Sequence, residues 1–345
     1  MSDDVAAPMS AHALGVESEA GPPPDKVASP PDVSVIVVNY NTARLLPEMR
    51  AALERSRGRL RLQLIVVDNA SRDDSAALLR REFGDAQLIF NETNVGFGRA
   101  NNQGFALAKG RYVLLLNTDA FVAPDTLGKT IDYMDSHPDC GVLGVRLVGS
   151  DGELQPSCRY FPGPWNVFLA RAGLARFFPP ARMVDDMSWD HASIRECDWV
   201  VGCYYLVRRE VVESVGLFDP RYFLYCEEVD HCRAVKRAGW KVVFFPHTSV
   251  VHLGGESAKS DARLTPAGRQ ISALQIESEL LYFRKHHGLS GVLVFVALSF
   301  VADGVLLLKA LLKGRGLNAL VAPMKHAGSL LRLASRTVLG ERPTR

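Results

Sequence analysis

The sequence lacks several features that define large functional classes of protein. Its six cysteines form no CxxC pair, and its nine histidines show no spacing typical of zinc ligands. The formal net charge is only +2, so the composition gives no case for nucleic-acid binding. We therefore expect reduced thiols in a cytosolic protein, no structural zinc site and no nucleic-acid partner.

Two common nucleotide-binding signatures are also missing. No GxxxxGK[ST] loop occurs, and Gly96 and Gly98 begin a GxG pattern that has no third glycine at the dinucleotide spacing. These absences argue against a P-loop NTPase and a Rossmann dehydrogenase. The two glycines are better explained by a tight turn that brings backbone close to a ligand.

The first 32 residues carry neither the basic nor the apolar region of a secretory signal. They are rich in Ala, Ser, Pro and Asp, and the run Pro22-Pro23-Pro24 lies among them. Such a composition cannot bury enough apolar surface to fold. We expect residues 1–32 to form a disordered N-terminal tail.

From Val33 onward, short β-branched runs alternate with helical stretches. Strands are predicted at Val33–Val38, Leu62–Val67, Gln87–Phe90 and Tyr112–Leu116, and helices at Leu45–Ser56, Asp74–Phe83 and Arg99–Lys109. This alternation predicts an α/β fold with a Rossmann-like, mostly parallel sheet flanked by helices. In such sheets ligands bind beyond the C-terminal ends of the strands.

Polar residues follow all four of these strands. They begin at Asn39, Asp68, Asn91 and Asn117. Helix capping explains part of this pattern, because Ser and Asp are good N-caps. Four polar strand ends in register at one edge of a sheet nevertheless favour a nucleotide pocket.

An acidic block, Glu227-Glu228-Val229-Asp230, follows a Gly-x-Phe-Asp turn and opens a predicted helix. The macrodipole of a helix favours acidic residues in its first turn, which is the purely structural explanation. The block also lies downstream of Asp119, a carboxylate at a strand end that could hold a divalent cation. A cation site and a general base are the two parts needed to transfer a group away from a diphosphate.

Other segments are less regular. Residues 155–196 contain many prolines and predict a long loop or lid, whereas Asp198–Val207 and Lys241–Phe245 predict strands. Trp165, Trp189 and Trp199 could form an acceptor-stacking surface or could pack in the core.

The C-terminal region is apolar and basic. Leu289–Leu312 is long enough to span a bilayer, but Asp303 would be costly at its centre. Its flanks carry Lys309, Lys313 and Arg315. We therefore favour an amphipathic helical segment lying on a membrane surface, with a packed core helix and a true span as alternatives.

Eight ordered motifs together resemble one known family. They are Val33–Asn41, Val67–Ser71, Asn94–Gly98, Asn117–Asp119, Trp199–Gly202, Gly216–Asp219, Tyr225–Asp230 and Val251-His252. This set resembles the family 2 glycosyltransferases of GT-A fold, in the subgroup that includes bacterial rhamnosyltransferases. The resemblance covers about residues 33–290 and implies a GT-A domain at 33–262. The apolar, basic composition predicts a C-terminal helical, membrane-associating region at 263–345.

The resemblance also implies roles for individual residues. Donor-binding residues would be Asn39, Tyr40, Asp68, Asn94, Arg99, Asn117, Thr118 and Asp119. Asp119 and His252 would bind Mg²⁺ or Mn²⁺, although Asn117 leaves the motif with one carboxylate. Glu227 and Glu228 stand where the family has a catalytic Glu-Asp pair, with Glu228 as the base. Gly202 and Asp230 would contact the acceptor, with a structural role as the alternative for Asp230.

The implied reaction is inverting transfer of a sugar, best matched by L-rhamnose from dTDP-L-rhamnose, with a UDP-hexose as the alternative donor. The acceptor would be a polyprenyl-diphosphate-linked saccharide or another cell-envelope glycan. The enzyme would then be cytoplasmic, peripheral at the inner face of the bacterial plasma membrane. A nucleotidyltransferase and an inactive sugar-nucleotide-binding scaffold are the competing interpretations.

Overall fold

The computed structural model describes residues 30–178, 181–254, 269–314 and 316–345. Most of the predicted N-terminal tail lies outside these residues, as does the predicted boundary between 262 and 263. The chain from Pro31 to Arg345 forms one compact unit.

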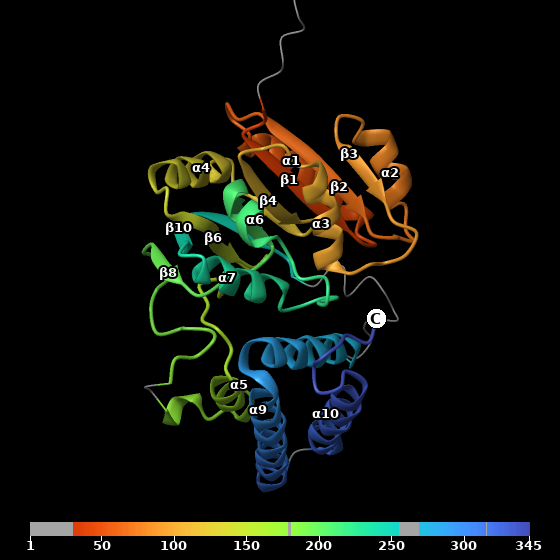
Figure 1. The fold of residues 1–345 in the computed structure, drawn as a ribbon, viewed down its shortest axis with the longest axis vertical. Coiled ribbons are helices and arrows are strands. Elements are labelled where there is room, and N and C mark those ends of the chain that lie inside the picture. Colours follow the sequence, from red (N-terminus) through yellow and green to blue (C-terminus); the bar gives the residue numbers. More distant parts are fainter. Residues whose placement is uncertain (1–29, 179–180, 255–268, 315) are drawn as a thin grey trace, which may run out of the picture. The chain divides into compact units, whose positions relative to one another are not determined.

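A mixed sheet lies at the centre of this unit, and helices cover both of its faces (Figure 1). Its strands follow the order β3-β2-β1-β4-β9-β6-β10-β5, with β7 beside β6 and β8 beside β10. Their bounds are β1 Val33–Asn39, β2 Leu62–Asp68, β3 Gln87–Phe90, β4 Tyr112–Asn117, β5 Ala120–Val122, β6 Cys140–Val148, β7 Leu154–Gln155, β8 Arg195–Cys197, β9 Tyr204–Arg208 and β10 Lys241–His252.

The α/β prediction is confirmed, and the sheet is mixed: β6 and β10 pair in parallel, as β1 to β4 do, but β9 separates these two parallel groups. Strands β1 to β4 pair in parallel, as the alternating apolar runs predict. Strand β9 then pairs antiparallel with both β4 and β6. Local periodicity cannot reveal this insertion, because β9 reaches its place only after a long excursion of the chain.

The helices divide between the two faces of the sheet. They are η1 Ala43–Leu45, α1 Leu46–Ser56, α2 Ser75–Glu82, α3 Phe97–Leu107, α4 Thr126–Ser136, α5 Pro164–Ala172, η2 Ala175–Phe177, α6 Arg209–Val215, α7 Glu227–Arg237, α9 Arg269–Leu312 and α10 Leu317–Arg336. Buried residues of α1, α2 and α4 pack with one set of strand side chains. Residues of α6, α7 and α9 pack with the alternate set.

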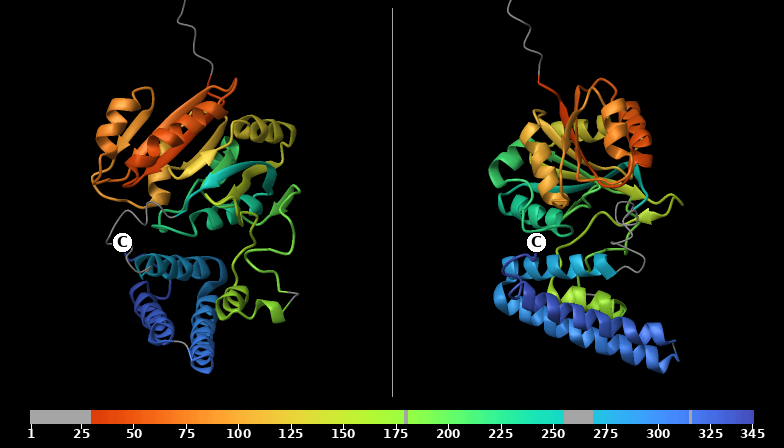
Figure 2. Two further views of the ribbon diagram at one scale, coloured as in Figure 1. Left: turned by 180° about the vertical axis from the view of Figure 1, so that it is seen from behind. Right: turned by 90° about the vertical axis from the view of Figure 1, so that its right-hand side faces the viewer.

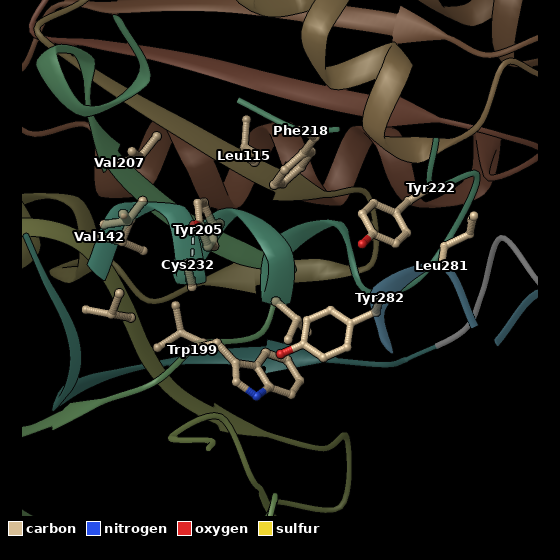
Figure 3. Packing of buried hydrophobic residues seen from close by; sticks show 14 of the residues in the cluster. Leu115, Val142, Trp199, Tyr205, Val207, Phe218, Tyr222, Cys232, Leu281 and Tyr282 are labelled. Atoms are coloured by element: carbon tan, nitrogen blue, oxygen red, sulfur yellow. Dashed lines mark hydrogen bonds between the residues drawn. The ribbon is translucent and has the colours of Figure 1, made fainter. Parts of the chain in front are cut away.

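Figure 3 shows the second cluster, in which Trp199, Tyr205 and Phe218 lie near Tyr222 and Tyr282. The Tyr205 hydroxyl lies 3.2 Å from the Cys232 thiol. Burial raises the pKa of this thiol to about 12, with the Tyr205 hydrogen bond working in the opposite direction. Tyr282 belongs to α9, so the C-terminal helices share the core that holds α7.

Three predicted elements differ from those observed. Strand β9 begins at Tyr204 and not at Asp198, because the backbone at 198–199 is bridged to Arg159 instead. Strand β10 runs unbroken from Lys241 to His252, with a register shift between Phe245 and Ser249. The predicted loop at 155–196 contains α5, which begins at Pro164 and ends before Gly173 in the left-handed conformation.

The C-terminal helices form a hairpin (Figure 2). Helix α9 is kinked at Gly288, where φ is 66° and ψ is −168°. By length and composition α9 could cross a membrane. Only 28% of its most apolar window is buried inside the protein, so most of that window is not covered by other helices. Near the turn, Leu312 and Leu317 are 78% and 74% exposed. The packed-core alternative therefore explains only one side of this helix.

Candidate active site

The polar ends of β1, β2 and β4 meet in one hydrogen-bond network. Asn39 Nδ2 donates to Asp68 Oδ1 at 2.7 Å and to Ser71 Oγ at 3.0 Å. Thr42 Oγ1 donates to Asn39 Oδ1 at 2.7 Å and lies 2.9 Å from Thr118 Oγ1. Because the carboxyl ends of parallel strands share one edge, distant sequence segments converge here. Tyr40 and Asn117 flank this network and are half-buried.

The glycine turn lies beside the network and forms the entry to α3. Asn94 Oδ1 accepts the backbone N–H of Gly96 at 2.9 Å. Gly96 has φ 93°, and a Cβ there would lie 2.5 Å from the carbonyl oxygen of Phe223. Arg99 donates to the carbonyl of Pro220 at 2.8 Å. Asn94 and Arg99 therefore shape the turn and join it to the segment before α7.

Asp119 and His252 lie together at the end of the sheet. Asp119 Oδ1 is 3.6 Å from His252 Nε2, and both residues are largely buried. Burial lowers the pKa of His252, against the opposing charge of Asp119. The structure thus brings together the two predicted metal-binding residues.

Gln155 fixes the orientation of this histidine. Its Nε2 donates to the His252 carbonyl at 2.9 Å, so its Oε1 is left to accept from His252 Nδ1, also at 2.9 Å. The proton then resides on Nδ1, and the Nε2 lone pair faces Asp119. At 3.6 Å the two groups are too far apart for a direct hydrogen bond. A cation between them could be bound by both.

This donor set fits a divalent cation only partly held by protein. Among the described residues no cluster of three or more His, Cys, Asp or Glu side chains is placed to hold a metal. Magnesium is commonly bound by one or two carboxylates, water and substrate phosphates. Asp119 and His252 therefore fit a metal whose other ligands come from the donor substrate.

The acidic block forms the first turn of α7 after two strained residues. Tyr225 and Cys226 have φ of 73° and 68°, a conformation that is unfavourable for residues other than glycine. This turn points the two glutamates differently. Glu227 is buried, and its Oε2 has no hydrogen-bond partner among the described residues. Glu228 lines an open cavity instead.

The environment of Glu228 suits a proton acceptor. Burial raises the pKa of this carboxyl, while Arg159 and the backbone N–H of Gly202 act in the opposite direction. A Cβ at Gly202 would lie 3.8 Å from Glu228 Oε1. Gly202, predicted to contact the acceptor, thus lies against the candidate base. Burial, together with the charge of Glu228, raises the pKa of Glu227 well above its usual range.

The cavity beside Glu228 has a volume of about 550 Å³ and lies between α7 and the helices α5, α9 and α10. Its polar lining residues include Arg159, Arg171, Glu228, Gln275, Glu279, Ser299 and His326. Val167, Trp199 and Phe295 are among its apolar lining residues. It therefore combines a candidate base, two cations and an apolar wall.

Asp230 lies elsewhere. It does not line this cavity, and its carboxylate receives hydrogen bonds from Lys285 Nζ at 2.7 Å and His286 Nε2 at 2.6 Å. Both partners belong to α9. This arrangement favours the structural alternative for Asp230, as a connection between α7 and α9.

The three tryptophans separate in the same way. Trp199 lines the cavity and donates its indole N–H to the carbonyl of Tyr160. Trp189 stacks on His191, and Trp165 packs on Phe168. Only Trp199 is placed to contact a molecule in this cavity.

Sequence reasoning missed Gln155, Arg159 and Arg171. All three lie in or beside the segment predicted as an irregular loop. One signal was available, because Pro164 near a helix start and Gly173 just past its end are typical of helix boundaries. It could have located α5 and hence Arg171.

Comparison with known proteins agrees with this geometry. Residues 34–186 match the family model described as Glycosyl transferase family 2. An N-acetylglucosaminyl-diphospho-decaprenol L-rhamnosyltransferase of Mycobacterium tuberculosis is 28% identical over 244 residues, which cover 66% of this chain and 78% of that protein. Rhamnosyltransferase WbbL of Escherichia coli is 26% identical over 174 residues, which cover 48% of this chain and 63% of that protein.

A solved structure supports the fold. The mannosyltransferase PcManGT from Pyrobaculum calidifontis, in complex with GDP-Man and Mn²⁺, superposes with a TM-score of 0.52 at 17% identity. The match covers 89% of this chain and 87% of that one. Sequence motifs, topology and relatives agree that residues 34–186 form a glycosyltransferase family 2 domain, in a chain whose fold is similar to that of the mannosyltransferase.

Proposed function

We propose that this protein transfers L-rhamnose from dTDP-L-rhamnose to a hydroxyl of a polyprenyl-diphosphate-linked saccharide, with inversion at the anomeric carbon. The observation that carries this proposal is the position of Glu228. Its carboxylate lines a cavity that also has an apolar wall from α5 and α9. A saccharide on a lipid carrier needs a polar site for the sugar and an apolar surface for the lipid.

Glu228 is the proposed base. Its carboxylate takes the proton of the acceptor hydroxyl, and the hydroxyl oxygen bonds to the anomeric carbon from the face opposite the leaving group. The bond from that carbon to the phosphate oxygen breaks, and its electron pair leaves with the nucleoside diphosphate. A positioned base of this kind is typically worth about 10²–10⁴ in rate.

The donor would bind at the sheet edge. Tyr40 and Asp68 are proposed to contact the base or ribose, and Asn94 and Arg99 hold the turn that faces the diphosphate. Thr118 joins this edge to the network around Asn39. Asp119 and His252 would hold Mg²⁺ or Mn²⁺, which would stabilise the negative charge developing on the leaving diphosphate.

The C-terminal hairpin is proposed to dock on the cytoplasmic surface of the plasma membrane. Exposed apolar residues gather near its turn, among them Leu308, Leu311, Leu312 and Leu317. The exposed Lys313 lies among them and suits anionic lipid headgroups, whereas Lys309 donates to the carbonyl of Ala172 at 2.7 Å. Docking there would bring the cavity to the lipid-linked acceptor.

The test is nucleoside diphosphate release from dTDP-L-rhamnose, UDP-glucose, UDP-N-acetylglucosamine and GDP-mannose. Each donor is incubated with Mg²⁺, Mn²⁺ or EDTA, with and without N-acetylglucosaminyl diphosphate on a short prenyl chain. We expect metal-dependent release from dTDP-L-rhamnose, stimulated by the acceptor. Product anomeric configuration, read by NMR, then tests inversion.

Other outcomes identify the competing functions. Acceptor-stimulated release from a UDP-sugar would replace the donor and keep the mechanism. Tight nucleotide binding without turnover of any donor would favour an inactive sugar-nucleotide-binding scaffold. Turnover of a sugar 1-phosphate with a nucleoside triphosphate would identify a nucleotidyltransferase and reject the proposal.

A further inference from the structure

Asp303 is the least expected residue of the apolar hairpin. It lies within α9 among apolar neighbours and is 3% exposed. Arg171 Nη2 of α5 lies 2.6 Å from its Oδ1, and His326 Nδ1 of α10 lies 2.8 Å from its Oδ2. One carboxylate therefore joins three helices. Because apolar residues of similar volume often stabilise a fold equally well, such a buried cluster calls for another explanation than stability.

Arg171 is the member of this cluster that lines a cavity on either side. It belongs to the cavity of Glu228 and also to a second cavity of about 310 Å³ that Lys309 and Lys313 line. Its Nε is buried and has no hydrogen-bond partner among the described residues. Asp303 thus fixes one end of the guanidinium and leaves other donors available for an anion.

Arg159 supplies a second cation in the cavity of Glu228. Its positive charge opposes the rise in pKa that burial causes at Glu228, so this charge acts on the candidate base. Its guanidinium also lies 4.9 Å from the Trp199 ring centroid, and its Nε lies 2.7 Å from Asp185 Oδ1. The charge of Arg171 instead opposes the rise in pKa that burial causes at Glu279, on α9. The charges of the two arginines therefore act on different carboxyl groups of the cavity.

Besides Glu228, Glu279 is the carboxyl of this cavity that would oppose an anion. Burial raises its pKa to about 7, while Gln275 and Arg171 act in the opposite direction. A carboxyl with this pKa is substantially protonated near neutral pH, so it repels an anion less than a full charge would. It can also donate a hydrogen bond in its protonated form.

We infer that Arg171, held in place by Asp303, binds the diphosphate of the lipid-linked acceptor. The inference rests on the proposed function and locates its acceptor. Arg159 assists at the end near Glu228, where the acceptor saccharide presents its hydroxyl. Val167, Ala170 and Phe295 form the apolar wall for the first prenyl units. Guanidinium groups suit phosphate because their N–H donors match its oxygens in pairs.

The experiment compares two acceptors with the same saccharide, one on a short prenyl diphosphate and one on a neutral alkyl chain. Removing Arg171 alone would leave the buried Asp303 carboxylate with His326 as its remaining partner and without the arginine charge, so Arg171→Gln is made together with Asp303→Asn. Asp303→Asn alone and Arg176→Gln, which changes an exposed arginine nearby, are the controls. The measured quantity is the ratio of kcat/KM for the two acceptors.

We expect the double variant to lower this ratio about 30-fold, as loss of charge-assisted hydrogen bonds implies. Asp303→Asn alone should lower it about fivefold, because the guanidinium loses its orientation. Arg176→Gln should leave it unchanged. Equal losses for both acceptors, or an unchanged ratio in the double variant, would overturn the inference.

Direct binding separates this inference from the proposed function. Calorimetry with the short prenyl diphosphate alone needs no turnover. If wild type binds it and the double variant does not, the assignment of Arg171 stands even when no donor is consumed. If vesicles of phosphatidylglycerol displace the prenyl diphosphate through the same arginine, the site recognises bulk lipid headgroups and the inference fails.

Discussion

The sheet edge and the helical cavity are built on opposite principles. At the sheet edge, Asn39, Asp68, Thr42 and Thr118 satisfy one another's hydrogen bonds within the protein. In the cavity, Arg171 Nε has no partner among the described residues, and Glu228 faces open space. A satisfied network holds a fixed shape, whereas unpaired polar groups are costly until a ligand meets them.

The difference suggests a division of labour. Under the proposed function, the sheet half would form a rigid frame for the donor, and the helical half would present reactive and charged groups to the acceptor. The halves meet at α7, whose first turn carries Glu228 and whose Asp230 binds Lys285 and His286 of α9. The following predictions test that division.

The largest effect is expected from Glu228→Gln. The amide keeps the shape but accepts no proton, so turnover with the lipid-linked acceptor should fall by about 10²–10⁴. Donor affinity, measured by calorimetry, should stay within about twofold because the donor frame is untouched. Glu213→Gln, an exposed carboxylate on α6, is the matched control. Wild-type turnover in Glu228→Gln would show that Glu228 is not the base.

Asp230→Asn tests the connection between the halves. His286 would lose its buried charge partner, whereas Lys285 would keep Asp219 at 2.8 Å, so the free energy of unfolding should fall by about 3 kcal/mol, mainly through His286. Although burial opposes it, hydrogen bonds from His286 and Lys285 lower the pKa of Asp230. The stabilisation is therefore complete above the unfolded pKa of about 3.9 and is lost as pH falls through the folded value.

Denaturant titrations at neutral and acidic pH would measure this difference. Asp139→Asn serves as the control, because Asp139 pairs with Lys241 on the surface and both side chains are about half exposed. The control should leave the midpoint unchanged. Equal stability of Asp230→Asn and wild type would mean that apolar packing alone joins α7 to α9.

Gln155→Leu sharpens the description of the sheet half. Without its side chain, His252 loses the hydrogen bond that fixes its ring, so the metal concentration for half-maximal turnover should rise about tenfold. Gln87→Leu changes an exposed glutamine at the start of β3 and should leave that concentration unchanged. An unaltered metal requirement in Gln155→Leu would show that His252 does not depend on this contact.

The smallest effect is expected at the hairpin turn. Replacing Leu311 and Leu312 by Ser removes exposed apolar surface, so affinity for anionic vesicles should fall about fivefold without loss of stability. Leu107→Ser changes an exposed leucine on the sheet half and should have no effect on sedimentation with vesicles. Undiminished binding by the double variant would place the membrane contact elsewhere.

Much of the sheet half could be predicted from sequence, because its information is local. Apolar runs located β1 to β4, and the residues that follow them formed the observed network. The pairing of Asp119 with His252 was predicted only through the family resemblance, since 132 residues separate them. Of the two glycines predicted to form a tight turn, Gly96 does so with φ 93°, whereas Gly98 lies in the first turn of α3.

The helical half could not be predicted in the same way. The sequence identified Asp303 as costly in an apolar helix, but its partners Arg171 and His326 lie on other helices. Strand β9 was extended too far because Trp199 and Val200 have strand propensity, although their backbone meets Arg159. Tertiary contacts determine the backbone and the partners of such residues, and neither periodicity nor composition contains information about these contacts.

The insertion of β9 between β4 and β6 also determines when the molecule can be completed during synthesis. The four parallel strands emerge from the ribosome first, and the free edge of β4 stays unpaired until Tyr204–Arg208 is made. Strand β10 must follow before β6 gains its second long neighbour. Unpaired apolar edges promote association between chains. A nascent chain that stalls before Tyr204 would therefore expose the unpaired edge of β4, which favours aggregation. Chaperones would be needed most until β9 is made.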